Sequence, residues 1–173
     1  MMNKKLIAAI TGLLWVLLAL GMIASKQHTL RTGKIVVLET VPVDPRDFLR
    51  GDYVVLSYKI SRLDLNQIES EKPFYRRGEN VYVRLKAQGR FWQAVAVQSK
   101  KSSYGGAMFI KGRVEYCYNK QLTLNYGIES YFVPEGQGRE IEKYMAGSKS
   151  SVSVEAIVDS GGNALIKKVY IDR

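Results

Sequence analysis

The sequence predicts a mainly β protein, in which an N-terminal transmembrane helix is followed by an antiparallel β-barrel or sandwich domain with one or two short helices. Three observations predict this architecture. One long uncharged run occupies the N-terminus, and β-branched and aromatic residues alternate with polar ones through most of the chain after residue 33. Long helical patterns do not separate the strand-like segments, which argues against an α/β sheet. We therefore expect two units, residues 1–29 as tail and anchor and residues 30–173 as the β-rich domain.

The N-terminal run from Leu6 to Ser25 holds 20 residues without a charge, with Lys4 and Lys5 before it and Lys26 after it. At about 1.5 Å per helical residue, such a run spans the roughly 30 Å hydrocarbon core of a bilayer. We predict an uncleaved anchor. A cleaved signal peptide is the first alternative, although its apolar core is usually about 7–15 residues long. A helix buried in a soluble core is the second.

The segments after the anchor alternate between strand patterns and turn residues. Strands or extended segments are expected at 34–40, 52–60, 80–87, 91–100, 108–118, 121–126, 131–133, 151–159 and 164–172. Gly89 lies between two of them and can supply the positive φ that a hairpin turn requires. Gly138–Ala146 is predicted to be a helix, since acidic residues lie early in it and Gly147 follows it. Asp64–Arg77 is polar, and a short helix is a further possibility there.

The composition restricts the classes of partner. The chain carries 26 basic and 16 acidic residues, a net charge of +10. Only Lys4, Lys5 and Lys26 precede residue 30, so the domain holds 23 basic and 16 acidic residues, a net of +7. Such a domain is attracted to anionic lipid headgroups or to an acidic partner. We expect no nucleic-acid partner, because the basic residues are scattered and no binding motif is present.

Cysteine and histidine are too rare for most metal or thiol chemistry. Cys117 is the single cysteine, so no intrachain disulfide forms, and its place in a strand pattern favours a buried, small apolar residue. His28 is the single histidine and follows the apolar run. Neither a phosphate-binding glycine loop nor a CxxC motif is present. We expect no cofactor and no metal.

The most distinctive stretch is Pro42–Tyr58, which reads PVDPRDFLRGDYVVLSY. Five charges fall within nine residues, directly before a strongly predicted strand. One interpretation is a loop tied down ahead of a central strand. The other is a binding rim on a rigid strand, because functional side chains concentrate on loops that a scaffold positions. The members of this candidate rim are Asp44, Arg46, Asp47, Arg50, Asp52 and Tyr53, with Glu129 and Glu135 near them.

A second stretch, Tyr126–Glu142, is rich in carboxylates. Glu129, Glu135, Glu140 and Glu142 lie within 14 residues of one another. Two carboxyl groups can serve as general acid and base when their surroundings separate their pKa values. A structural loop, a binding rim and a catalytic site are all compatible with this pattern.

Gly51–Tyr58, GDYVVLSY, fits the pattern GDYXXLXY letter for letter. The chain resembles the family of bacterial membrane-anchored proteins that this pattern names. The flanking DPRD and LRGDY segments resemble the family too, as does YGIESYFVPEGQGREIE at 126–142. The resemblance implies an envelope protein of uncharacterised biochemical role, and relatives that accompany multi-pass membrane proteins.

Together these observations predict a single-pass protein of the inner (cytoplasmic) membrane, with its domain facing the periplasm or the cell exterior. A short tail inside is the simpler topology, because long domains are translocated largely regardless of flanking charge. The expected role is that of a non-enzymatic accessory or interaction partner of an integral membrane protein. The alternative is a carboxylate-dependent hydrolase or transferase that uses Asp52 or Glu135 as its base.

Overall fold

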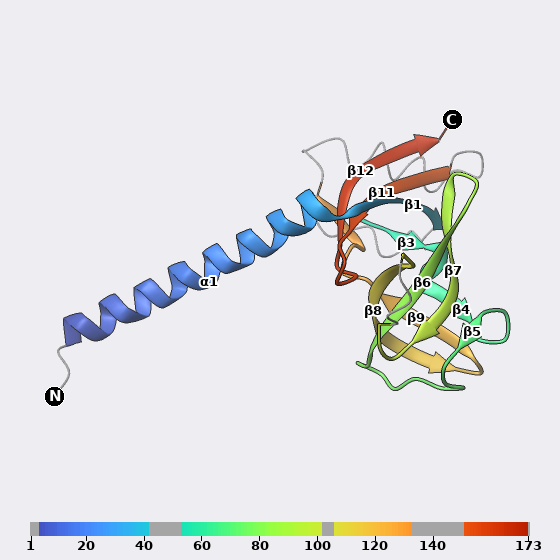
Figure 1. The fold of residues 1–173 in the computed structure, drawn as a ribbon, viewed down its shortest axis with the longest axis horizontal. Coiled ribbons are helices and arrows are strands. Elements are labelled where there is room, and N and C mark those ends of the chain that lie inside the picture. Colours follow the sequence, from blue (N-terminus) through green and yellow to red (C-terminus); the bar gives the residue numbers. More distant parts are fainter. Residues whose placement is uncertain (1–3, 42–52, 102–105, 133–150, 173) are drawn as a thin grey trace.

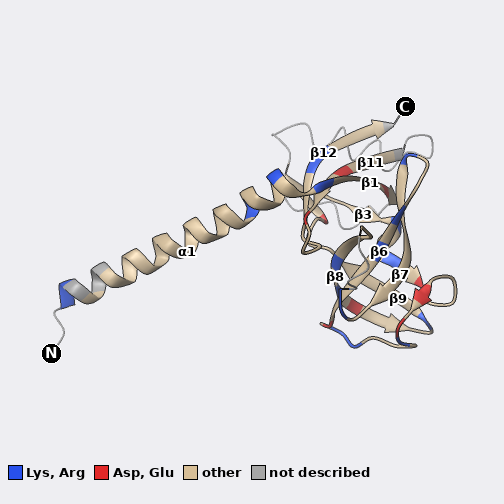
Figure 2. Ribbon diagram, viewed as in Figure 1, with Lys and Arg blue, Asp and Glu red and all other residues tan. Residues whose placement is uncertain are grey.

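The computed structural model describes residues 4–41, 53–101, 106–132 and 151–172. Helix α1, Lys4–Thr32, is 29 residues long and projects from a β-rich domain as a straight rod (Figure 1). Its segment Ile10–Thr32 is long and apolar enough to cross a membrane, and none of its most apolar 18-residue stretch is buried against the domain. The alternative of a helix buried in the domain core is therefore wrong. Basic residues flank the apolar part of the rod at both ends (Figure 2).

The domain consists of short and long strands arranged in three sheets within the described residues. A four-stranded sheet has the order β12-β11-β1-β3, a two-stranded sheet pairs β10 with β2, and a six-stranded sheet has the order β4-β9-β8-β6-β7-β5. The strands are β1 Lys34–Val41, β2 Tyr53–Val55, β3 Ser57–Tyr58, β4 Arg62–Asp64, β5 Glu69–Ser70, β6 Asn80–Gln88, β7 Phe91–Gln98, β8 Met108–Tyr118, β9 Gln121–Asn125, β10 Ser130–Phe132, β11 Ser151–Val158 and β12 Ala164–Asp172.

The strands curl into a half-barrel around one apolar core. Irregularities in strand register between Arg84 and Leu85, and between Val114 and Tyr116, bend the six-stranded sheet. Alternate residues of β1, β6 and β9 point inward, as the pleat requires. The buried inward set includes Val36 and Leu38 of β1, Val81 and Val83 of β6, Ile110 of β8, Leu122 and Leu124 of β9, and Val152, Val154 and Ala156 of β11.

The rod and the domain are joined through a single residue, Gly33. Its N–H donates to Thr29 O at 2.9 Å, which closes the last turn of α1, and β1 begins at the next residue. A Cβ at Gly33 would lie 2.3 Å from Ile157 Cγ2 and 2.7 Å from Thr29 O. Only glycine fits this joint. The chain therefore has no flexible linker between the apolar rod and the sheet.

Most of the sequence-based strand predictions are confirmed. Strand β8 has the predicted bounds, and the hairpins β6–β7, β8–β9 and β11–β12 form where expected. Gly89 has a φ of +62°. Asn119 and Lys120 have φ values of +47° and +62°, as a tight two-residue hairpin turn requires.

Two predictions need correction, and a third lies outside the described residues. The expected strand 52–60 is divided into β2, β3 and a 3₁₀ turn at Lys59–Ser61, because the chain changes its pairing partner from β10 to β1. No helix forms in Asp64–Arg77, which instead contains a turn and β5, and β5 pairs parallel to β7. The predicted helix Gly138–Ala146 lies outside the described residues.

Candidate functional site

The candidate rim is described only in part. Asp44, Arg46, Asp47, Arg50, Asp52 and Glu135 lie outside the described residues, so their role as a rim stays a prediction. Tyr53 begins β2, and its backbone alone is described. The side chain and surroundings of Glu129 are both described. Glu129 and β2, the strand that follows the charged stretch, are therefore the described part of the candidate site.

Strands β2 and β10 bring the two distinctive stretches of sequence together. They pair antiparallel, with Tyr53 opposite Phe132, Val54 opposite Tyr131 and Val55 opposite Ser130. Tyr53 is the first described residue after the charged stretch, and Phe132 is the last one before Glu135. The aromatic side chain of Phe132 is 77 % exposed. The described ends of the two stretches, which are far apart in the sequence, thus lie side by side at this ladder.

Two buried tyrosines, one from each stretch, each donate a hydrogen bond to a backbone carbonyl in or next to the other stretch. The Tyr58 hydroxyl donates to Ile128 O at 2.5 Å, and the Tyr126 hydroxyl donates to Ile60 O at 2.6 Å. Burial, and secondarily the negative charge of Glu129, raises the pKa of both hydroxyls well above the usual range. Both tyrosines therefore stay neutral donors. The two hydrogen bonds hold the turn after Tyr58 against the turn after Tyr126.

Glu129 connects to the same pair of turns. Its carbonyl accepts the Leu56 N–H at 2.7 Å, and its carboxylate Oε1 accepts the Tyr126 N–H at 2.5 Å. Burial raises the pKa of the carboxyl, although hydrogen bonds from backbone N–H groups, that of Tyr126 first among them, act in the opposite direction. The carboxyl group holds its own turn together. Among the described residues, no group of three or more His, Cys, Asp or Glu is placed to hold a metal ion.

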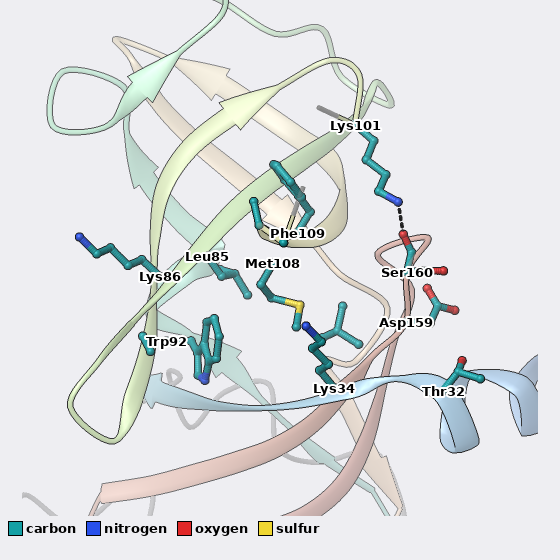
Figure 3. A pocket seen from close by; sticks show the side chains of 14 residues that line it. Thr32, Lys34, Leu85, Lys86, Trp92, Lys101, Met108, Phe109, Asp159 and Ser160 are labelled. Atoms are coloured by element: carbon teal, nitrogen blue, oxygen red, sulfur yellow. Dashed lines mark hydrogen bonds between the residues drawn. The ribbon is translucent and has the colours of Figure 1, made fainter. Parts of the chain in front are cut away.

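A cavity of about 610 Å³ lies where α1 enters the domain, and Thr32 and Lys34 are among the residues that line it. Its apolar wall comes from Leu85, Trp92, Met108, Phe109 and Val158, which lie on β6, β7, β8 and β11. Lys34, Lys101, Asp159 and Thr32 lie around its mouth (Figure 3). The Lys34 amine points toward Met108, whereas the amine of Lys86, another lining residue, points away (Figure 3).

Sequence reasoning did not single out this cavity. Leu85 and Met108 look like ordinary core positions of alternating strands, and Lys34 looks like a solvated charge after a helix. The signal that was available is Trp92, a large aromatic residue at the start of a strand whose cross-strand neighbour is the small Ala87. Because the cavity is enclosed by strands that are distant in sequence, only their curvature reveals it.

A model of the GDYXXLXY protein family matches residues 15–169. The chain belongs to the GDYXXLXY family. The resemblance expected from residues 51–58 is thereby confirmed over most of the chain. No curated protein and no solved structure matches the chain. The structure accounts for two letters of the GDYXXLXY motif: Leu56 is the buried residue whose N–H bonds Glu129, and Tyr58 is the neutral donor to Ile128.

Proposed function

We propose that this GDYXXLXY protein is a single-pass protein of the cell envelope, anchored in the cytoplasmic membrane by α1 with its domain in the periplasm or outside the cell. In this proposal it acts as a non-enzymatic accessory partner of an integral membrane protein. The observation that carries the proposal is the joint at Gly33. A domain that continues from a membrane-spanning helix without a linker stays at the bilayer surface, where its partners must also lie.

The surfaces of α1 also support a partner inside the bilayer. The space around Gly12 and Gly21 is open, since an added Cβ would meet no atom within 4 Å. Glycine positions allow the close approach of another helix in a membrane. Outside the bilayer, the ladder of β2 and β10 supplies a face with the exposed Phe132 opposite Tyr53, the first described residue after the charged stretch. The partner thus has both a helix face and a domain face available.

Co-purification tests the partner. The tagged full-length protein, extracted in mild detergent, is expected to retain an integral membrane protein in a fixed ratio. Gly12→Leu and Gly21→Leu add bulk that the isolated chain tolerates, and at least one of them is expected to reduce the retained partner severalfold. Gly89→Asn, placed at a hairpin turn with positive φ in the domain, is the matched control. Recovery of the wild-type chain alone after crosslinking in the membrane would refute the proposal.

Labelling with a membrane-impermeant maleimide tests the topology. The native Cys117 is first replaced by serine. Tyr118→Cys then places a thiol at a position that is 72 % exposed in the domain, and Lys4→Cys places one before the apolar run. In intact cells with a permeabilised outer layer, only Tyr118→Cys is expected to react. Reaction of Lys4→Cys alone would show the reverse topology.

A further inference from the structure

We infer that the cavity beside the α1 joint binds an anionic phospholipid of the membrane that α1 spans, with an acyl chain against Leu85, Trp92 and Met108 and the phosphate at Lys34 and Lys101. This inference rests on the proposed membrane anchoring of α1 and adds a ligand that the proposed partner role does not require.

The first argument is the position of the cavity. The apolar run ends at Ser25, and seven helical residues, Lys26 to Thr32, follow it. At about 1.5 Å per residue they carry the end of α1 about 10 Å beyond the hydrocarbon core. The headgroup layer extends roughly 5–8 Å from that core on each side. Thr32 and Lys34 both line the cavity, so its mouth lies just above the lipid headgroups.

The second argument is the size and the apolar character of the interior. A volume of about 610 Å³ lies within the roughly 300–1,000 Å³ of small-molecule sites. Trp92 and Met108 are only half-buried, although both pack against the core cluster, so their apolar surface faces the cavity. Unbranched, polarisable methionine suits a flexible apolar occupant. The acyl chains of the lipids directly below the mouth are the nearest apolar molecules, and a lipid drawn part-way out of the bilayer can place one in the cavity.

The third argument is the charge at the mouth. The Lys34 side chain is exposed and has no ion-pair partner among the residues that the structure describes. The Lys101 amine donates to the backbone carbonyl of Ser160, which is a neutral acceptor and not a carboxylate (Figure 3). Asp159, the one acid in the lining, is already bonded to Thr29 and Asn163. The mouth thus holds two cations and one carboxylate, a net charge of +1 that favours a phosphate.

Fluorescence quenching tests the acyl chain directly. The chain has two tryptophans, and Trp15 lies inside the apolar run. In full-length protein carrying Trp15→Phe, Trp92 is the sole tryptophan. The protein is reconstituted in phosphatidylcholine vesicles that contain either phosphatidylglycerol with brominated acyl chains or brominated phosphatidylcholine. We expect Trp92 to be quenched by brominated phosphatidylglycerol at low mole fraction, and by brominated phosphatidylcholine only at much higher mole fraction.

Charge variants test the phosphate. Lys34→Gln and Lys101→Gln are each expected to raise the phosphatidylglycerol fraction needed for half-quenching about fivefold, since one cation near a membrane is worth about one such factor. Lys120→Gln is the matched control. Lys120 follows the far end of β8 and is not among the residues that line the cavity, so its removal should change nothing. Met108→Gln, with both lysines intact, should weaken quenching by making the cavity wall polar.

The outcomes separate this inference from the proposed anchoring. If the protein does not float with the vesicles, anchoring fails and the lipid site fails with it. If the protein floats but Trp92 is not quenched by either lipid, the site fails and the anchoring stands. Equal quenching by both lipids that survives Lys34→Gln and Lys101→Gln also overturns the site, because it shows only that the domain touches the bilayer.

Discussion

Thr29 of α1 and Asp159, which follows β11, are joined by a hydrogen bond of 2.7 Å from the threonine hydroxyl to carboxylate Oδ2. Thr29 is 3 % exposed, although it belongs to the helix that projects from the domain. The bond fixes the last turn of the helix to the turn between β11 and β12. Together with Gly33, it determines the direction in which the rod leaves the sheet.

Thr29→Val is expected to destabilise the joint by about 1–3 kcal/mol, because it keeps the shape of the side chain and removes a bond to a charged acceptor. Denaturant unfolding in detergent measures the loss, and faster amide exchange at Gly33 locates it. The matched control is Thr32→Val, since the Thr32 hydroxyl is exposed and donates only within the helix, to His28 O. Equal losses in the two variants would contradict a specific link between α1 and Asp159.

Asp159 also predicts a dependence of stability on pH. Burial acts to raise the pKa of its carboxyl, but hydrogen bonds from Thr29, Asn163 and Gly161 outweigh it and hold the pKa below the ordinary 3.8. A carboxyl with a lowered folded-state pKa stabilises the fold above its unfolded pKa, and this stabilisation is lost as the pH falls through the folded value. The stability difference between wild type and Asp159→Asn should thus be constant from pH 7 to about 5 and shrink below about 4. Unfolding curves across that range check it.

The reciprocal tyrosine bonds predict coupled losses. Tyr58→Phe and Tyr126→Phe each leave a buried carbonyl without its donor, at a cost of about 1–3 kcal/mol. Because both bonds fasten the same two turns, the double variant should lose less than the sum of the single losses. Tyr118→Phe, at an exposed position, is the control and should cost almost nothing. Additive losses in a double-mutant cycle would show that the two bonds act independently.

The region around Tyr58 and Glu129 shows which parts of the fold can be predicted from the sequence and which cannot. Val54, Leu56 and Tyr58 alternate along the sequence as one face of a strand does, and all three are almost fully buried. The alternation does not show that the strand divides at Leu56, because the division follows from a partner, Glu129, more than 70 residues away. Hairpins such as β6–β7 were predictable since their turn residues are local. The sequence predicts Glu129 near the rim because it shares a carboxylate-rich stretch with Glu135, whereas its bond to Tyr126 N depends on the turn itself.

Two substitutions of Glu129 distinguish the effect of its charge on stability from the effect of its hydrogen bonds. Burial raises the pKa of this carboxyl, so the wild-type fold should gain stability as the pH falls from neutral through the folded pKa toward 4.5, below which the gain is complete. Glu129→Gln keeps an oxygen acceptor for the Tyr126 N–H and lacks a titrating group, so this part of the pH dependence should vanish. Glu129→Ala leaves the amide unpaired and should be about 1–2 kcal/mol less stable than Glu129→Gln at every pH, since neither variant titrates at this position. A pH profile of Glu129→Gln identical to that of wild type would show that another group titrates.

The joint at Gly33 yields the strongest steric prediction. Gly33→Ala places a Cβ 2.3 Å from Ile157 Cγ2 and 2.7 Å from Thr29 O, distances that real Cβ atoms do not show, so either the helix end or β11 must move. We expect the free energy of unfolding to fall by about 1–3 kcal/mol, as for overpacking in a core. Amide exchange along β1 and β11 should become faster. Gly21→Ala, where the added Cβ meets nothing within 4 Å, is the matched control.

Adding Ile157→Ala to Gly33→Ala removes the side-chain clash but leaves the clash with the Thr29 carbonyl, so the rescue of stability should be partial. Complete rescue would place the whole constraint on Ile157, and an unaffected Gly33→Ala variant would show that the rod is not rigidly joined to the sheet.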